Sequence, residues 1–433
     1  MFSFSVPLFE APDEPHHLLY VDFIAANHRL PNLNTSDRVE VPNEGYQPPL
    51  YYTLAAGLLN LLGRSRVDPQ ISKNPAFPTV PHVLNAYVHS PDEYLQPDAL
   101  IVHIIRLLSV FCGAVTVFLT YEMARTIQLR TEVALLAAAI NASIPEFLFL
   151  TGTVSNDSLS WMTASLTLLF TFRLYMKKDV NWLNVFYLGA ALTGALLTKA
   201  TSLILVPFII AVLAVKGILE EEDQMRLGLL KATICLAAMV FLLAGWWYVR
   251  GVVLYGDFTG LKMNAELNPS LVVNRSIWSS YFENIFPIWV FSSFWAVFGW
   301  MNIWPMNVWP GQLYFGFYSV VSAVGAGGAI IEIKPSGPLS SRRITRITLL
   351  ILIGFSILAL AALIALNLSV DTPQGRFLFV AISPICVLLA QGLNRSLRTK
   401  PDWFSHVVLL ALVVVMFALS VHFLFFLRAI YST

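Results

Sequence analysis

Charge is the scarcest property of this sequence. Only 12% of the 433 residues are Asp, Glu, Lys or Arg, whereas 57% are hydrophobic and the mean hydropathy is +0.67. Soluble domains carry about 25% charged residues, so a water-soluble fold of this composition would lack the polar groups to cover its surface. The net charge of +1 provides no basic field that would attract nucleic acid. The composition therefore predicts an integral membrane protein with no nucleic-acid partner.

Cysteine is also scarce. The three cysteines, Cys112, Cys235 and Cys386, lie in apolar runs, where we expect them to pack as small hydrophobic side chains rather than form disulfides. His16 and His17 stand together, but no second cluster of His or Cys follows at the spacing of metal ligands. A divalent metal cofactor stays open, but ligand spacing does not support it.

Long apolar runs dominate the rest of the chain. A helix needs about 20 apolar residues to cross the hydrocarbon. Runs of about this length occur at 101–121, 133–152, 158–176, 182–198, 200–217, 229–249, 311–331, 347–367, 377–393 and 404–427. We therefore predict an all-α polytopic membrane protein with about ten transmembrane helices, grouped in two blocks at 101–249 and 311–433.

Two stretches lack such runs. Residues 1–100 are rich in Pro and Asn, and their one short apolar piece, "LYYTLAAGLLNLLG", predicts an interfacial helix. Residues 250–310 are dense in Trp and Phe, which favour the headgroup boundary. We predict that both are exterior loops. Because "MFSFSVPLF" is too short to lead the first loop across a bilayer, we expect a preceding first helix to be missing from this sequence.

The distribution of Lys and Arg predicts the orientation, because short cytoplasmic loops carry most of them. Alternate connections hold the cations Arg125, Arg130, Arg173, Lys177, Lys178, Lys216, Arg226, Lys231, Lys334, Arg342, Arg343, Arg346, Arg395, Arg398 and Lys400. We predict that these connections face the cytoplasm. Residues 1–100, residues 250–310 and the turns at Asn156, Lys199 and Arg376 then face the outside, in a plasma membrane.

The predicted outer face collects ionisable residues. Asp13 and Glu14 lie in "PDE", and Glu44 lies in "NEGYQPPLYY". The cations at the ends of predicted spans are Lys199, Arg250 and Arg376. Ionisable groups near a bilayer are costly and indicate function. A carboxylate can take a proton from a hydroxyl, and cations can bind a lipid-borne phosphate and stabilise its charge as it leaves. This combination favours sugar transfer from a polyprenyl-phosphate carrier.

Each residue also has a simpler explanation. "PDEP" is typical of a solvated turn, and Lys199 can snorkel from a helix end. Arg250 and Arg376 can be interfacial anchors, and Asp157 can cap the helix that begins at Ser158. What favours a common site is that all these acids and cations are predicted to lie on the same side of the membrane.

Several motifs resemble the GT-C superfamily of membrane glycosyltransferases, which includes protein O-mannosyltransferases and bacterial aminoarabinose transferases. The first are the acidic "PDE" and "E-x-x-QPPLYY". Others are "SNDSL", "ALLTKATSLILVPF", "GWWYVRGVVLYGD", "FWAVFGWMN" and "QGRFLFVAISP". They are similar to a bacterial and archaeal branch of mannosyltransferase-like members and cover almost the whole chain.

The resemblance implies a GT-C fold and a glycosyltransferase that uses a polyprenyl-phosphate-linked sugar. It places catalytic acids at Asp13, as general base, and at Glu14 and Glu44. It implies that Arg250 and Arg376 contact the donor phosphate, with Lys199 as a weaker contact. We predict that the further substrate-binding residues are Asn156, Asp157, His16, Tyr46 and Gln47. The acceptor hydroxyl can belong to a protein, a lipid or a glycan.

Two other functions stay open. A secondary transporter or flippase would place charges near the middle of broken helices and show repeated halves, whereas here the charges lie at span ends and no repeat is evident. A scaffold that has kept the fold without catalysis is the third possibility.

Overall fold

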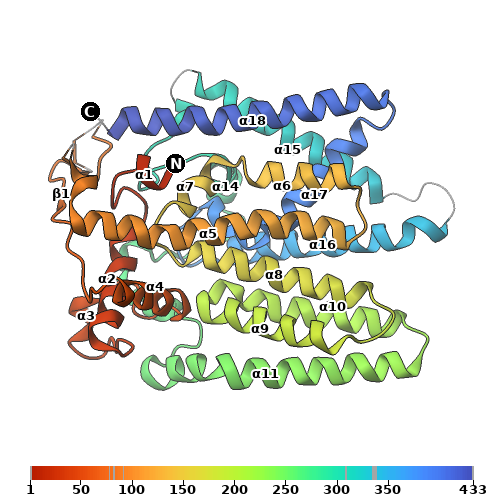
Figure 1. Cartoon of the computed structure of the whole chain (residues 1–433), viewed down its shortest axis with the longest axis horizontal. Helices are drawn as coiled ribbons and strands as arrows, with labels where there is room; N and C mark the ends of the chain where they lie inside the picture. Colours follow the sequence, from red (N-terminus) through yellow and green to blue (C-terminus); the bar gives the residue numbers. More distant parts are fainter. Residues whose placement is uncertain are drawn as a thin grey trace.

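Long helices that run side by side form the body of the molecule (Figure 1). The computed structural model describes residues 2–77, 79–80, 83–90, 92–307, 310–333 and 339–431. The long elements are α5 (Pro97–Thr126), α6 (Thr131–Asn141) with α7 (Pro145–Thr151), α8 (Asp157–Met176), α9 (Trp182–Thr198), η2 (Ala200–Ile204) with α10 (Leu205–Leu219), α11 (Asp223–Tyr255), α15 (Gly311–Ile333), α16 (Leu339–Asn367), η5 (Gly375–Ala381) with α17 (Ile382–Ser396), and α18 (Asp402–Tyr431). The chain is therefore an all-α, multi-pass membrane protein.

Every apolar run predicted from the sequence falls on one of these helices. By length and hydropathy, seven helices among the described residues can cross a membrane, or eight if α6 and α7, bent by 62°, form one span. The helix α9 is shorter, with 17 residues, and α8 is not among the seven. The predicted helices are thus confirmed, while the count of about ten spans stays a prediction.

The helix α8 is more polar than its neighbours because protein surrounds it. It packs between α5 and α9, and its hydroxyl residues Ser158, Ser160, Thr163, Ser165, Thr167 and Thr171 are all buried. Except for that of Ser158, these hydroxyls hydrogen-bond to backbone carbonyls or to other side chains, as when the hydroxyls of Ser165 and Ser383 meet at 2.9 Å. Buried hydroxyls of this kind join helices inside a bilayer, so hydropathy alone underestimates this helix.

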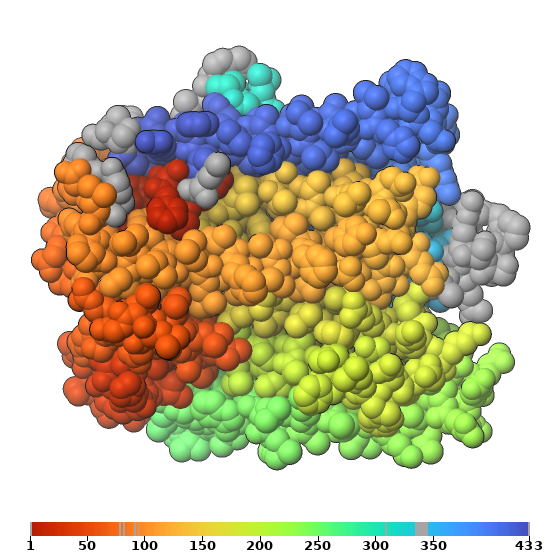
Figure 2. Space-filling model, viewed as in Figure 1, coloured from red at the N-terminus to blue at the C-terminus, as the bar shows by residue number. Residues whose placement is uncertain are grey.

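Residues 1–100 gather at one end of the molecule (Figure 2) and hold more structure than the sequence predicted. Their elements are α1 (Phe2–Ser5), α2 (Glu14–Asn27), α3 (Asp37–Glu40), α4 (Leu50–Leu61), the antiparallel pair β1 (Ser72–Lys73) and β2 (Tyr87–Val88), and η1 (Glu93–Leu95). The predicted short helix is α4. The sequence analysis missed α2, whose buried residues include Glu14, His17 and Asp22, because such polar residues break the apolar pattern.

The aromatic stretch 250–310 is only partly a boundary belt. It contains the end of α11, then α12 (Leu261–Leu267), η3 (Pro269–Leu271), α13 (Ser280–Asn284), α14 (Phe286–Trp295) and η4 (Pro305–Asn307). Trp278 is 87% exposed, as a belt residue would be. Trp295 is 1% exposed and stacks on Tyr318 with ring centroids 4.4 Å apart. This stretch therefore contributes to the core as well as to the surface.

Three glycines bring α15 and α17 into backbone contact. A Cβ atom on Gly328 would lie 2.1 Å from the carbonyl oxygen of Gly392, and one on Gly392 would lie 1.7 Å from the carbonyl oxygen of Gly325. Small residues at such contacts let membrane helices approach closely. The contact fixes the relative positions of the two helices.

This packing predicts that Gly328→Ala lowers the stability of the protein by about 1–3 kcal/mol, because the added methyl group overlaps backbone that cannot move aside. Gly327→Ala is the matched control, since its Cβ meets nothing within 4 Å, and alanine favours a helix by about 0.5–1 kcal/mol. Thermal unfolding of the purified protein measures both changes. Equal unfolding temperatures for the two variants would contradict the close approach.

Candidate active site

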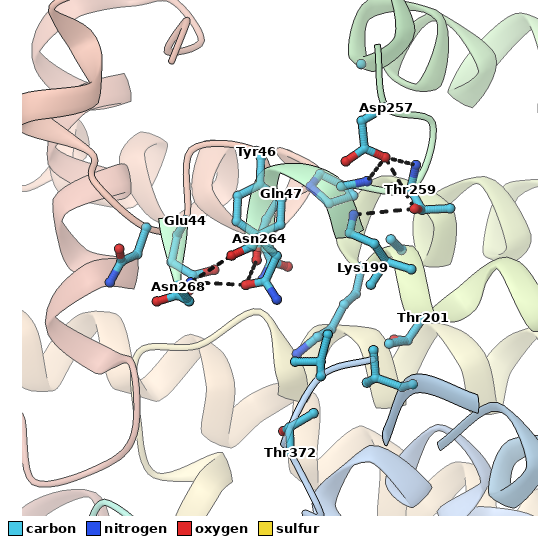
Figure 3. A pocket seen from close by; sticks show the side chains of 18 of the residues that line it. Glu44, Tyr46, Gln47, Lys199, Thr201, Asp257, Thr259, Asn264, Asn268 and Thr372 are labelled. Atoms are coloured by element: carbon cyan, nitrogen blue, oxygen red, sulfur yellow. Dashed lines mark hydrogen bonds between the residues drawn. The ribbon is translucent and has the colours of Figure 1, made fainter. Parts of the chain in front are cut away.

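A polar cavity of about 260 Å³ lies at the end of the bundle where residues 1–100 gather. Its walls come from the loop before α4, the C-terminal ends of α9 and α11, α12, and the segment 366–377 (Figure 3). Eight residues predicted from the sequence line it: Asp13, Glu44, Tyr46, Gln47, Asp157, Lys199, Arg250 and Arg376. The structure thus brings together residues from both ends of the chain.

Ion pairs connect four of these residues. Arg376 donates to Asp13 at 3.0 Å and lies 3.7 Å from the other aspartate, Asp157. Asp157 accepts a hydrogen bond from Lys199 at 2.5 Å. The side chains of Asp157 and Arg376 are at most 10% exposed, and charges this far from water are stable only when paired. Asp157 is the first residue of α8 rather than its cap, and the Lys199 side chain is 13% exposed in its pair with Asp157.

Asp13 precedes α2 in an unusual backbone conformation. Its φ is 64°, a left-handed value that is uncommon outside glycine but less costly for Asp than for most residues, and such strain clusters at functional sites. Its carbonyl oxygen accepts from the backbone N–H groups of His16 and His17, whereas its carboxylate caps no helix N–H. The carboxylate is 40% exposed and faces the cavity.

Asp13 is ionised at neutral pH. Burial opposes its ionisation, but the charge and hydrogen bond of Arg376, together with smaller contributions from His17 and His16, hold the pKa of Asp13 below its usual value. Asp13 therefore presents a carboxylate that accepts hydrogen bonds and donates none.

Close backbone packing sets the position of Arg376. The N–H of Gly375 donates to Ser293 Oγ at 2.7 Å, and a Cβ on Gly375 would lie 2.3 Å from the carbonyl oxygen of Val290. This contact holds the start of η5 against α14. Among the described residues, nothing accepts a hydrogen bond from Nε of Arg376.

Arg250 reaches the cavity from the last turns of α11. Its Nη2 donates to the carbonyl oxygen of Pro31 at 2.6 Å, and its guanidinium lies 5.1 Å from the centre of the Trp247 ring. Its Nη1 finds no partner in the part of the chain that the structure describes. Two of the three cations at the cavity thus each have a buried donor without a partner among the described residues.

Glu44 is a neutral acid. It is 8% exposed, its Oε2 has no hydrogen-bond partner among the described residues, and the nearest cation-forming group is His17 at 4.0 Å. Burial, together with the charge of Asp13, raises the pKa of Glu44 to about 8. Burial lowers the pKa of His17 to about 4. At neutral pH Glu44 is therefore protonated and His17 uncharged, so they form no ion pair.

Glu14 does not line the cavity, although it adjoins Asp13 in sequence. Its carboxylate pairs with Arg106 at 2.6 Å, both side chains being 0% exposed. It also accepts from the backbone N–H groups of Phe9 and Val154, each at 2.9 Å. These contacts occupy Glu14 completely, so it holds the loop rather than meeting a substrate.

Asn156 and His16 also lie outside the cavity lining. Asn156 donates to Gln47 Oε1 at 2.9 Å and to the carbonyl oxygen of Thr198 at 3.1 Å. It therefore braces a lining residue against the end of α9. His16 is half-buried, and its Nδ1 has no partner among the described residues.

The sequence analysis missed much of the wall formed by residues 247–271. The carboxylate of Asp257 accepts from the N–H groups of Thr259, Gly260 and Met263 (Figure 3). Across the cavity, Tyr46 donates its hydroxyl to Asn264 at 2.9 Å. The available sequence signal for this wall was the motif "GWWYVRGVVLYGD", which contains Gly251 and Asp257. In the structure a Cβ on Gly251 would lie 2.6 Å from the Asp257 carbonyl oxygen, so this position requires glycine.

No three His, Cys, Asp or Glu side chains within the described ranges are grouped so as to hold a metal ion.

Loss of the buried Glu14 carboxylate should destabilise the fold. Glu14→Ala leaves Arg106 charged and buried, which costs about 3–5 kcal/mol. Glu122→Ala is the matched control, because its pair with Arg173 is more exposed, at 28% and 37%, and such pairs contribute about 0–1 kcal/mol. Denaturant unfolding compares the variants. A loss no larger for Glu14→Ala than for Glu122→Ala would refute the anchoring role.

Glu44 should make stability depend on pH. Between pH 4.5 and about 8 the folded chain keeps a proton on Glu44 that the unfolded chain has released. The free energy of unfolding therefore falls as pH rises through this window. Glu44→Gln stays neutral and should remove that part of the fall. Thermal unfolding at pH 5 and pH 8 tests this, with the exposed Glu40→Gln as control. An unchanged pH dependence in Glu44→Gln would show that Glu44 ionises normally.

Comparisons with known proteins agree with this architecture. Residues 102–247, less than half of the chain, match the family model of the dolichyl-phosphate-mannose-protein mannosyltransferases. No curated protein matches the chain in sequence. The crystal structure of ArnT from Cupriavidus metallidurans bound to undecaprenyl phosphate is similar at a TM-score of 0.50 and 12% identity, over 99% of this chain and 71% of that chain.

A second similar structure is the apo oligosaccharyltransferase of Archaeoglobus fulgidus. Its TM-score is 0.50 at 14% identity, over 98% of this chain and 52% of that chain, so the present chain matches about half of its length. Identities this low show the fold alone. The chain therefore has the GT-C fold, the fold of the membrane glycosyltransferase superfamily that its own motifs resemble.

Proposed function

We propose that the chain is a glycosyltransferase that moves a sugar from a polyprenyl-phosphate carrier to an acceptor hydroxyl. The acceptor belongs to a protein, a lipid or a glycan, and the reaction takes place on the non-cytoplasmic face of a plasma membrane. The observation that carries the proposal is the single cavity that gathers Asp13, Asp157, Lys199, Arg250 and Arg376.

The cations of the cavity suit a phosphate group. Guanidinium groups bind phosphate with two parallel hydrogen bonds, and both Arg250 and Arg376 keep a donor without a partner among the described residues. The related ArnT structure holds undecaprenyl phosphate. By analogy of fold, a phosphate on a polyprenyl chain is the ligand that we propose here.

An apolar groove of about 610 Å³ next to the cavity suits the chain of such a carrier. Phe286, Val290 and Leu360 are among its lining residues. The consecutive residues Phe377 and Leu378 lie one in the wall of the cavity and the other in the wall of the groove. A lipid lying in the groove would therefore have its phosphate close to Arg376.

The proposed reaction begins when the donor phosphate competes with Asp13 for Arg376. Release from the ion pair raises the basicity of the Asp13 carboxylate, which can then accept the proton of the acceptor hydroxyl. The acceptor oxygen bonds to the anomeric carbon of the sugar as the bond from that carbon to the phosphate oxygen breaks. The phosphate leaves with the electron pair, and Arg250, Arg376 and Lys199 stabilise its charge.

Asp13→Asn should lower the rate of transfer by about 10²–10⁴-fold, because the amide keeps the shape of the side chain but cannot accept the proton. The assay supplies radiolabelled polyprenyl-phosphate sugar to the protein in proteoliposomes and measures labelled acceptor. Asp92→Asn, an exposed aspartate of the same segment, is the matched control. Normal turnover by Asp13→Asn would refute its role as base.

The same assay separates the enzyme from a transporter or flippase. Covalent transfer of label to an acceptor supports the glycosyltransferase. Unmodified label that crosses the bilayer supports the transporter. If label is neither transferred nor moved across the bilayer, the scaffold is favoured.

A further inference from the structure

A second cavity lies at the opposite end of the helix bundle from the candidate active site. It measures about 190 Å³ and lies between the ends of α5, α6, α15, α16 and α17 (Figure 1). Its charged lining residues are Arg130, Glu332, Arg346, Arg395 and Arg398. Four guanidinium groups therefore meet one carboxylate.

The pairing of these groups is incomplete. Glu332 lies 2.9 Å from Arg395 Nε and 3.6 Å from Arg398 Nη1. Arg130 has only a neutral partner in the cavity lining, the Asn394 side chain at 3.2 Å. Arg346 makes no ion pair among the described residues, and its Nε is buried without a hydrogen-bond partner there. The positive charge gathered around this space thus exceeds what Glu332 can neutralise.

Arg395 lies on α17 and Arg346 on α16, whereas Arg130 directly precedes α6 and Arg398 follows the end of α17. The backbone contact of Gly325 and Gly328 with Gly392 lies one to two helical turns from Glu332 on α15 and from Arg395 on α17. The side chain of Glu332 is 13% exposed. The packing of α15 against α17 therefore fixes Glu332 beside Arg395, and Arg130, Arg346 and Arg398 reach the same cavity from the neighbouring segments.

The positive-inside tendency explains why arginines occur at this end, but not why four converge on one cavity. Arg226, also at the predicted cytoplasmic end, illustrates the ordinary arrangement. Its side chain is 50% exposed and bonds to the Glu220 carbonyl oxygen and, within the first turn of α11, to Asp223. Convergent guanidinium groups with free donors are instead a typical arrangement for binding phosphate.

We propose that this second cavity binds a phosphate-bearing anion. Two sources supply that chemistry at a membrane boundary: the headgroup of an anionic phospholipid of the adjacent leaflet, or a free phosphate compound from solution. Basic pockets between membrane helices on the cytoplasmic side are known to hold anionic headgroups. The site is separate from the catalytic cavity and does not depend on the proposed sugar transfer.

The test uses the full chain, purified in neutral detergent and phosphate-free buffer. Its thermal unfolding is followed while dioleoylphosphatidylglycerol, dioleoylphosphatidylcholine, glycerol 1-phosphate or inorganic phosphate is added. Stabilisation by phosphatidylglycerol but not by phosphatidylcholine identifies a lipid headgroup. Stabilisation by glycerol phosphate or inorganic phosphate identifies a free phosphate compound. If none of the four raises the unfolding temperature, the proposal is overturned.

Variants then locate the site. Arg346→Gln combined with Arg398→Gln should weaken the apparent affinity about tenfold or more, since it removes two charge-assisted contacts. Glu332→Gln should strengthen it, because the competing carboxylate is lost. Arg226→Gln is the control for loss of positive charge at the same end, and it should leave affinity unchanged.

The opposite signs of these effects separate binding from a structural role. A residue that only supports the fold would lower stability when changed, and neither variant would then alter the response to the phosphate compound. Equal affinity in Glu332→Gln and in the unaltered protein would overturn the proposal even if the double arginine variant failed to fold.

Discussion

The contact of one arginine with two aspartates is the constraint on which the cavity depends. Arg376 meets Asp13 and Asp157, and Asp157 also holds Lys199. The side chains of Asp157, Lys199 and Arg376 are at most 13% exposed, and such charges are not stable without a partner. The pairs therefore oblige the loop before α2, the start of α8, the end of α9 and the start of η5 to meet. The paired side chains also line the cavity between these segments. The ion pairs that join the segments therefore also supply the charged groups of the cavity.

The adjacent acids Asp13 and Glu14 lie in different environments because the backbone at Asp13 is left-handed. The left-handed φ of Asp13 directs its carboxylate to the cavity, while that of Glu14 lies buried against Arg106. Arg106 also donates to the carbonyl oxygens of Ser3, Val6 and Pro7. One buried guanidinium thus fixes the segment that carries Asp13. Asp13 can thus face the cavity because Glu14 is buried in its pair with Arg106.

The sequence predicted what depends on hydropathy and on position along the chain. The helices followed from apolar runs, and eight of the eleven proposed site residues line one cavity at one end of the bundle. It did not predict α2, because Glu14, His17 and Asp22 are buried there by contacts with distant residues. Nor could it separate Asp13 from Glu14, since the partner of Glu14 lies 92 residues away. Long-range pairing of polar groups leaves no periodic trace in a sequence.

The two cation clusters of this protein differ in what an anion would displace. At the candidate active site, Arg376 and Lys199 already have carboxylate partners, so an incoming phosphate competes with an aspartate and leaves that aspartate more basic. At the other end, Arg346 has no carboxylate among the described residues to release. An anion there would neutralise charge without creating a base. The cations of the two cavities are therefore similar, but the cavity with paired aspartates suits the proposed catalysis and the other suits binding of an anion. The difference lies in the neighbouring carboxylates.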